Sequence, residues 1–188
     1  MRPNRRLFNL LGALACFAML GYALFEQFVG HLEPCPLCIL QRVTILALGI
    51  VFALAALQHP RGWGAYVYAC LIGVAALATI GVSARHLYVQ SLPLGSIPAC
   101  GAPLDVLLKM FPVTEVLRKV LHGGGECQQV TWRFLGLAMP GWVLLCAAAL
   151  GTFGVLTNVL LVKPQDEGSN RGAPSEGTVR KAAEGPVR

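Results

Sequence analysis

The stretch CILQRVTILALGIVFALAAL, from Cys38 to Leu57, holds a single charged residue, Arg42, close to its start. A helix that crosses about 30 Å of hydrocarbon needs roughly 20 mostly apolar residues. In lipid, only helices and closed barrels satisfy all their backbone polar groups. Because the stretch shows no strict alternation of polar and apolar residues, it predicts a membrane-spanning helix.

Three further apolar runs are free of charge: Leu7–Phe25, Trp63–Ser83 and Trp142–Val162. The first follows the basic start MRPNRR, as a signal peptide does. It is long for the apolar part of a signal peptide, however, and no clear cleavage site of small residues follows it. We therefore expect an all-α fold, a four-helix transmembrane bundle in one membrane domain. Its boundaries are residues 1–162, with spans at about 7–25, 38–57, 63–83 and 142–162.

The composition of the whole chain agrees with a membrane protein. Its 188 residues are 55% hydrophobic and 13% charged, whereas about 25% of the residues of a soluble domain are charged. The net charge of +6 could suggest a nucleic-acid partner. The positive residues lie at the ends of apolar runs, not on one basic face. We expect no nucleic-acid partner and a lipid bilayer as the surroundings.

Positive charge also predicts the orientation of the spans, since Lys and Arg gather in cytoplasmic segments. The N-terminal segment, the connection QHPRG and the C-terminal tail carry Arg2, Arg5, Arg6, Arg61, Lys163, Arg171, Arg180, Lys181 and Arg188. Four spans put these three segments on one side, so we expect both termini in the cytoplasm. The loops at about 26–37 and 85–141 then lie outside. The tail, 163–188, has few large apolar residues and is expected to be disordered.

The seven cysteines fall into two groups. Three lie inside predicted spans and are interpreted as small hydrophobic residues: Cys16, Cys70 and Cys146. Four lie in or beside the outer loops: Cys35, Cys38, Cys100 and Cys127. An even number of thiols that face an oxidising compartment suggests disulfides.

The pair Cys35 and Cys38 has the C-x-x-C spacing of zinc sites and of redox sites. A zinc site would need a second such pair or histidines at a recurring spacing, and the chain has neither, so we expect no metal. A structural disulfide between neighbours closes a very short loop and removes little chain entropy. Redox chemistry is therefore the favoured interpretation of this pair. Between Cys100 and Cys127 the loop is longer, and a structural disulfide stays open there.

Position adds to the redox interpretation. If the second span begins near Cys38, the partial positive charge of the helix N-terminus stabilises a thiolate there. Arg42 lies about one turn further along the same face. An arginine just inside a span is costly and suggests a function, although its head could also reach back to the membrane surface. A thiolate and a guanidinium together could hold an electron-accepting ring.

Two motifs, PCPLCILQR at 34–42 and WRFLGLAMPGW at 132–142, resemble those of the DsbB family of bacterial disulfide bond formation proteins. The resemblance extends from Leu7 to about Val162. It implies an enzyme of the bacterial inner membrane, a disulfide oxidoreductase that reoxidises the periplasmic thiol oxidase DsbA. It also implies a quinone cofactor, ubiquinone or menaquinone, that receives the electrons. DsbA is a strong oxidant, so a stronger electron sink is needed to reoxidise it.

The resemblance assigns a role to each loop cysteine. Cys35 and Cys38 match the pair beside the quinone, with Cys38 as the thiolate that faces the ring. Cys100 and Cys127 match the loop pair that meets DsbA, with Cys100 as the sulfur that DsbA attacks. Cys127 would then attack Cys35.

Two further residues match the quinone-binding residues of the family. Arg42 matches the arginine required for reaction with quinone, and His86 matches a histidine near the quinone. Gln41 stands where the family pattern has an acidic residue, so we expect no charge at position 41.

The long outer loop contains one further pattern. Apolar residues recur at helical spacing from Leu104 to Leu121, with Pro112 as the expected break. A short helix that lies flat in the membrane interface fits this pattern, and a helix packed on protein alone is the alternative. The following HGGGEC, at 122–127, would give a flexible hinge that could carry Cys127 toward Cys35 and away again.

Two rival functions stay open. One is a relative with the same chemistry that serves another thiol partner. The other is a membrane adaptor without enzymatic activity, held by structural disulfides or by a zinc ion. The adaptor hypothesis assigns no role to Arg42 beside Cys38 and is therefore the weaker of the two.

Overall fold

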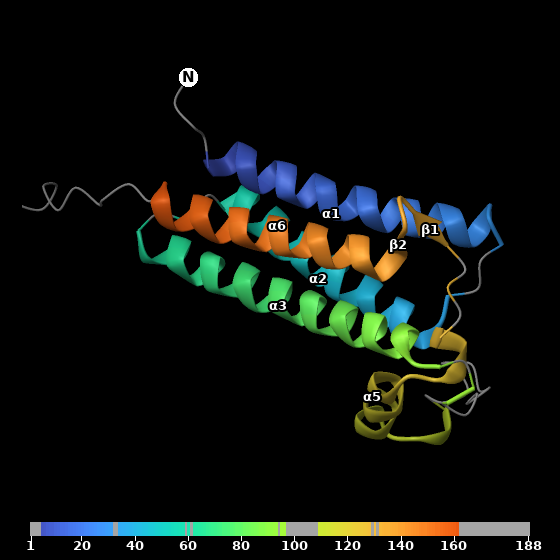
Figure 1. Ribbon diagram of the computed structural model, residues 1–188. Coiled ribbons are helices and arrows are strands. Elements are labelled where there is room, and N and C mark those ends of the chain that lie inside the picture. Colours follow the sequence, from blue (N-terminus) through green and yellow to red (C-terminus); the bar gives the residue numbers. More distant parts are fainter. Residues whose placement is uncertain are drawn as a thin grey trace, which may run out of the picture.

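Four long helices form a bundle in the computed structural model, which describes residues 5–31, 34–58, 60, 62–93, 95–96, 109–128, 130 and 132–161. The helices are α1 (Arg5–Phe28), α2 (Pro36–Gln58), α3 (Trp63–Ser91) and α6 (Met139–Leu160). Each is long and apolar enough to cross a membrane. The predicted all-α, four-helix class is confirmed (Figure 1).

Each helix extends beyond the apolar run that predicted it at one end or at both ends. The largest extension is in α3, which continues from the end of its apolar run at residue 83 to Ser91. Apolarity marks only the part of a helix that suits lipid, whereas backbone hydrogen bonding continues until a residue breaks it. Pro93 follows directly after Leu92, whose backbone is extended. The long loop, expected from about residue 85, therefore begins some residues later.

The bundle is antiparallel, with both ends of the described chain at one end of it. Figure 1 shows the start of α1, the end of α6 and the connection from α2 to α3 at that end. The opposite end carries a short helix, α5 (Val113–His122), a 3₁₀ helix, η1 (Gly125–Gln128), and a small hairpin. Three of the four predicted redox cysteines, Cys35, Cys38 and Cys127, lie at this second end. Cys100 lies outside the described residues, as do 101–108 and the tail 163–188.

Small residues let the helices approach closely around one buried phenylalanine. Phe52 of α2 lies in the main core cluster with Cys16, Ile45 and Ile72. A Cβ atom added to Gly154 of α6 would lie 2.6 Å from the Phe52 ring. Membrane helices commonly use such small residues at their contacts, because apolar burial drives little association in lipid.

A pair of buried amides joins the first and last helices. Asn9 of α1 and Asn158 of α6 donate to each other's side-chain oxygens, at 3.2 and 2.8 Å. Asn158 also donates to the carbonyl of Gly154 at 2.8 Å. The two amides thereby satisfy each other inside an apolar bundle, where an unpaired amide would be costly.

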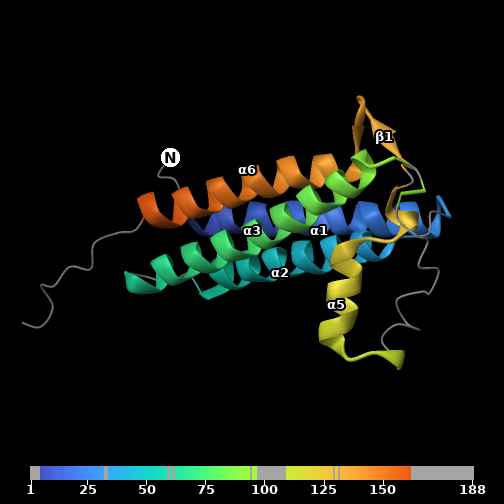
Figure 2. The same cartoon turned by 60° about the horizontal axis from the view of Figure 1, so that its bottom comes forward.

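Helix α5 crosses the end of the bundle at a steep angle to the long helices (Figure 2). It starts directly after Pro112, whose carbonyl accepts hydrogen bonds from Glu115 and Val116, so the expected break lies at the start of a helix. Val116 and Val120 pack on the protein, whereas Val113 is 71% exposed. One edge of α5 thus contacts the bundle, and other apolar residues remain available to lipid.

The hairpin was not expected from the sequence. Strands β1 (Arg133–Phe134) and β2 (Leu137–Ala138) pair antiparallel, with Phe134 opposite Leu137. Leu135 and Gly136, at the turn, have φ angles of 51° and 80°. Positive φ at both central residues is typical of the tight two-residue turns that join hairpin strands. The indole nitrogen of Trp142 donates to the Phe134 carbonyl at 3.1 Å, which ties the hairpin to α6.

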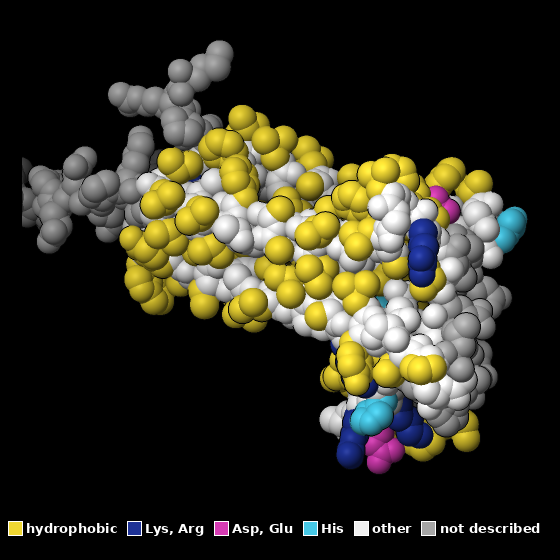
Figure 3. Space-filling model, in the orientation of Figure 1, with side chains coloured by type: hydrophobic (Ala, Val, Ile, Leu, Met, Phe, Trp, Pro, Cys, Tyr) yellow, Lys and Arg dark blue, Asp and Glu magenta, His cyan; other side chains and the backbone are white. Residues whose placement is uncertain are grey.

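Hydrophobic and charged side chains occupy different parts of the surface. Figure 3 shows a hydrophobic flank along the bundle, while the charged side chains on this face gather at the end that carries α5. Such a flank suits hydrocarbon, and such an end suits water and lipid headgroups.

Candidate active site

The start of α2 brings Cys35 and Cys38 together. Cys35 directly precedes Pro36, the first residue of the helix, and proline is favoured at that position. The backbone N–H of Cys38 donates to the Cys35 sulfur at 3.4 Å, and the two sulfurs are 3.2 Å apart as free thiols. Cys35 thus takes the capping position that satisfies an N–H in the first turn of a helix.

His86 reaches the cysteine pair from α3. Its ring is 2% exposed, and its Nε2 lies 3.7 Å from the Cys35 sulfur. On the other side of the ring, Nδ1 lies 3.2 Å from Oε1 of Gln41, whose Nε2 donates to Ser83 Oγ at 2.8 Å. With an amide oxygen beside it, Nδ1 must carry the ring proton, which leaves the Nε2 lone pair facing Cys35.

Arg42 is held by α1. Its guanidinium donates to the side-chain oxygen of Gln27 and, at 2.9 Å, to the carbonyl of Ala23. Both of these acceptors are neutral. The positive charge of Arg42 is therefore fixed in place by its partners without being neutralised by them.

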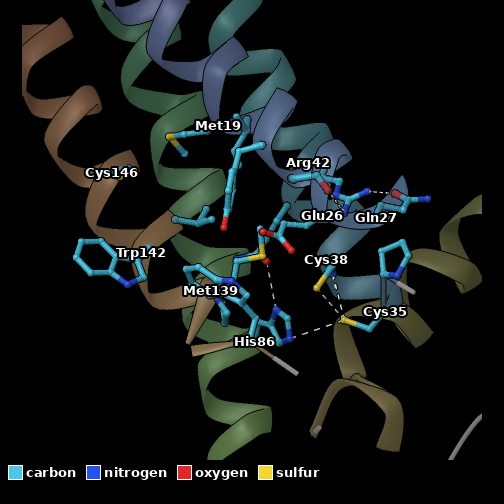
Figure 4. Close-up of a pocket in the computed structure, with 18 of the residues that line it drawn as sticks. Met19, Glu26, Gln27, Cys35, Cys38, Arg42, His86, Met139, Trp142 and Cys146 are labelled. Carbon is cyan, nitrogen blue, oxygen red and sulfur yellow. Dashed lines mark hydrogen bonds between the residues drawn. The ribbon is translucent and has the colours of Figure 1, made fainter. Parts of the chain in front are cut away.

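A cavity of about 410 Å³ opens beside these residues, between α1, α2, α3 and α6. Figure 4 shows Arg42, Glu26 and Gln27 on one side of it, with Cys146 and Trp142 on α6 across from them. The predicted residues Cys35, Cys38, Arg42 and His86 all line it. Its size and its mostly apolar wall, with a few convergent polar groups, are typical of small-molecule sites.

Cys127, in η1, packs beside Cys35. It is 1% exposed and packs with Leu37 and Val89, with Cys35 against the same cluster. The hydrogen bond between the Cys127 thiol and Cys35, together with burial, raises the pKa of Cys127 far above its ordinary value. The structure therefore places three of the four predicted redox cysteines in one series, from Cys127 to Cys35 to Cys38.

The pKa of Cys35 is also displaced. Its contact with Cys127 lowers that pKa, but the hydrogen bond with Cys38 and burial outweigh this effect and raise the value to about 12. Both Cys35 and Cys127 are therefore neutral thiols at neutral pH in the reduced protein.

Several cavity residues escaped the sequence analysis. Glu26 is the single acidic residue among the described residues that line the cavity. Gln90 donates to His86 Nε2 at 3.4 Å, while its Oε1 has no hydrogen-bond partner among the described residues. Cys146 lies in the cavity wall, whereas Cys16 is part of the core and Cys70 is exposed. Of these residues, only Glu26 could have been selected from the sequence, because it is an ionisable residue near the end of an apolar run.

Comparison with known proteins places this site in a family. The family model of disulfide bond formation protein DsbB matches residues 5–157. The chain belongs to the DsbB family. The match covers the four long helices almost completely, together with the cysteine pair, Arg42, His86 and Cys127.

Individual DsbB relatives agree over nearly their full length. The disulfide bond formation protein B of Nitrosococcus oceani is 49% identical over 82% of this chain and 92% of its own. That of Methylococcus capsulatus is 46% identical over 82% and 94%. That of Marinobacter nauticus is 42% identical over 87% and 96%. The protein is accordingly a multi-pass membrane protein of disulfide bond formation, with its cysteine pair at a cavity between the DsbB helices.

Proposed function

We propose that the protein reoxidises a DsbA-like thiol oxidase in the periplasm and passes the electrons to a membrane quinone, either ubiquinone or menaquinone. One observation carries the proposal. Cys127 and Cys35 pack in one cluster, the Cys35 and Cys38 sulfurs are 3.2 Å apart, and Cys38 lines the same cavity as Arg42. This is the order of groups that a relay from a loop thiol to a membrane-soluble acceptor requires.

The cavity suits a quinone ring in three respects. The apolar wall contributed by α1 and α6 suits a lipid-soluble molecule. Arg42 supplies a cation and N–H donors for ring oxygens, and the unpartnered Oε1 of Gln90 supplies an acceptor. When bound, a quinone would supply an acceptor for two electrons and two protons.

Thiol exchange would proceed through the contacts already described. In the oxidised protein Cys35 and Cys38 form a disulfide. The Cys127 thiolate attacks the Cys35 sulfur, a bond between Cys127 and Cys35 forms, and the bond to Cys38 breaks. Cys38 leaves with the electron pair as a thiolate, at the N-terminus of α2, where partial positive charge stabilises it.

Two side chains would handle protons. The Nε2 lone pair of His86 faces Cys35 and is placed to accept a thiol proton. Glu26, at the cavity wall, is placed to carry protons between the cavity and water.

The exchange between the thiol partner and the loop cysteines Cys100 and Cys127 follows from the family resemblance. A reduced DsbA-like partner would attack Cys100 of a Cys100–Cys127 disulfide and release Cys127 for the next exchange. The α5 end of the bundle would then face the periplasm and both termini the cytoplasm, in the inner membrane.

The test is quinone reduction by the purified protein with a reduced DsbA-like partner. Ubiquinone and menaquinone are offered separately, and the loss of partner thiols is counted against the quinone reduced. Equal counts of electron pairs support the proposal. A folded protein that exchanges thiols with the partner but reduces neither quinone would refute it. Competition between several thiol proteins would identify a relative that serves another partner.

A further inference from the structure

The tertiary structure assembles a group of metal-binding atoms that the sequence spacing did not predict. Cys35, Cys38 and His86 each offer one ligand atom, and these atoms all lie within 4.8 Å of one another. The histidine comes from a different helix, 51 residues after Cys35. A search for ligands at short recurring spacings therefore misses this set.

The distances fit a tetrahedral zinc ion. Zinc binds cysteine sulfur at about 2.3 Å and histidine nitrogen at about 2.0–2.1 Å, so neighbouring ligand atoms of a tetrahedron lie about 3.5–3.8 Å apart. The Cys35 sulfur lies 3.2 Å from the Cys38 sulfur and 3.7 Å from His86 Nε2. A zinc ion would require the two sulfurs to move apart by about half an ångström, whereas the Cys35 sulfur and His86 Nε2 are already separated by about the distance that it needs. The Cys38 sulfur and His86 Nε2 lie within 4.8 Å of each other.

The tautomer and the orientation of the His86 ring also suit a zinc ligand. Gln41 holds the Nδ1 proton of His86, so the Nε2 lone pair faces Cys35, and a bound metal ion would replace the long hydrogen bond that Gln90 donates to Nε2 at 3.4 Å. Zinc-binding histidines almost always donate their other ring N–H to a fixed acceptor, which orients the ring. Gln41 is itself buried and donates to Ser83, so the acceptor is fixed as well.

We propose that the reduced protein binds one Zn²⁺ ion through Cys35, Cys38 and His86. Two thiols lose their protons to water, two Zn–S bonds and one Zn–N bond form, and no electrons move. Two thiolates neutralise the charge of the ion, so the nearby Arg42 does not face a net positive site. The fourth zinc position is left for water, as in zinc sites with three protein ligands.

The zinc site exists only in the reduced protein. A disulfide between Cys35 and Cys38 removes both thiolates, so the oxidised protein has no zinc site. All three ligands line the cavity, which gives the ion a path to them. Bound zinc would hold both sulfurs out of thiol exchange, which makes the metal an inhibitor of the reduced state.

The test measures zinc uptake by the full chain in detergent, with no quinone and no thiol partner added. Its failure is therefore distinct from failure of the proposed function. The protein is reduced with a phosphine, freed of reductant and titrated with Zn²⁺ against a chromophoric chelator. The reduced protein is expected to take up one ion, and the oxidised protein none.

Substitutions test the ligand set. Cys38→Ser and His86→Gln should each weaken uptake by more than about 100-fold, because loss of an outer partner alone weakens zinc sites by about 10–100-fold. Gln41→Leu should fall within that smaller range. Cys70→Ser, on the exposed side of α3, is the matched control and should bind as the unchanged protein does.

Zinc X-ray absorption of the unchanged protein gives a result that does not depend on the folding of any variant. Two sulfur ligands, with nitrogen or oxygen completing the shell, are expected. A different number of sulfurs, no uptake by the reduced protein, or full uptake by folded Cys38→Ser or His86→Gln would overturn the proposal.

Discussion

Arg42 is the residue whose surroundings most constrain the chemistry at the cavity. Its partners on α1, Gln27 and the Ala23 carbonyl, fix the guanidinium without neutralising it. A charge held in this way inside a bundle is costly unless it meets an anion. The Cys38 thiolate and a reduced ring are the two anions that the proposed function brings to it.

Substitution of Arg42 should therefore weaken the quinone step selectively. A hydrogen bond to a charged group contributes about 1.5–3 kcal/mol, or about 10–100-fold in affinity. We expect Arg42→Ala to raise the apparent Michaelis constant for quinone by about that factor. Arg42→Lys keeps the charge but loses the planar fork, so its effect should be smaller. The measurement is steady-state quinone kinetics.

A single-turnover oxidation of the thiol partner provides the control for Arg42. This exchange uses Cys127, Cys35 and Cys38 but does not require the guanidinium, so its rate should be preserved. An unchanged quinone constant together with slow exchange would mean that Arg42 serves the loop cysteines or the fold.

The loop cysteines should differ in role. Without Cys127, no resolving thiolate remains to displace a partner bound at Cys100. We therefore expect Cys127→Ser, mixed with the oxidised DsbA-like partner, to accumulate a mixed disulfide, formed when the Cys100 thiolate attacks the partner's disulfide and one partner sulfur leaves as a thiolate. The adduct is visible as a non-reducing gel shift. Adding Cys100→Ser should abolish the adduct. An adduct that persists in the double variant would place the attack at another cysteine.

At the scale of the helices, α3 and α6 approach each other closely at Gly151. A Cβ atom added to Gly151 would lie 2.5 Å from the Cβ of Ala76, well inside van der Waals contact. The two helices can hold this distance only while position 151 has no side chain. The contact matters for the site because α3 carries His86 and α6 forms a wall of the cavity.

Gly151→Ala should therefore destabilise the bundle. Overpacking a well-packed contact typically costs about 1–3 kcal/mol, which exceeds the gain of up to about 1 kcal/mol from replacing glycine in a helix. We expect a lower apparent melting temperature in detergent. Gly81→Ala, in α3 with nothing within 4 Å of the added atom, is the matched control. Equal melting temperatures for the two variants would show that the contact relaxes freely.

At the scale of the whole molecule, the described residues form an even number of spans, so both ends of the described chain lie at one end of the bundle. The choice of side rests on the Lys and Arg residues of the terminal segments and of the connection from α2 to α3. Their position favours the cytoplasm for that end, by the positive-inside tendency.

Reporter fusions test this orientation. Residue 60 lies in the connection between α2 and α3, and residue 110 lies just before α5. A reporter active only outside the cytoplasm should be active at residue 110 and inactive at residue 60, and a cytoplasmic reporter should give the reverse. Activity of one reporter at both positions would contradict four spans with this orientation.

The sequence by itself determined the membrane class, the four helices and the family. Each of these depends on local properties. Twenty apolar residues in a row have few options in lipid, and the motifs around Cys35 and Trp132 are contiguous. The redox interpretation of Cys35 and Cys38 came from their spacing and position, whereas the roles of Cys100, Cys127 and His86 came from the resemblance. All of these roles remain predictions.

Only the tertiary structure decided which distant residues meet. The contact of Cys127 with Cys35, the ring of His86 beside the same sulfur and the place of Glu26 in the cavity wall join segments that are far apart in the chain. The hairpin at Leu135 and Gly136 also escaped prediction, because two-residue strands carry almost no periodic signal. An apolar pattern indicates whether a segment suits lipid or water, because that depends on its own residues alone. A site depends on which helix faces lie opposite each other, and only the packing of the helices determines those neighbours.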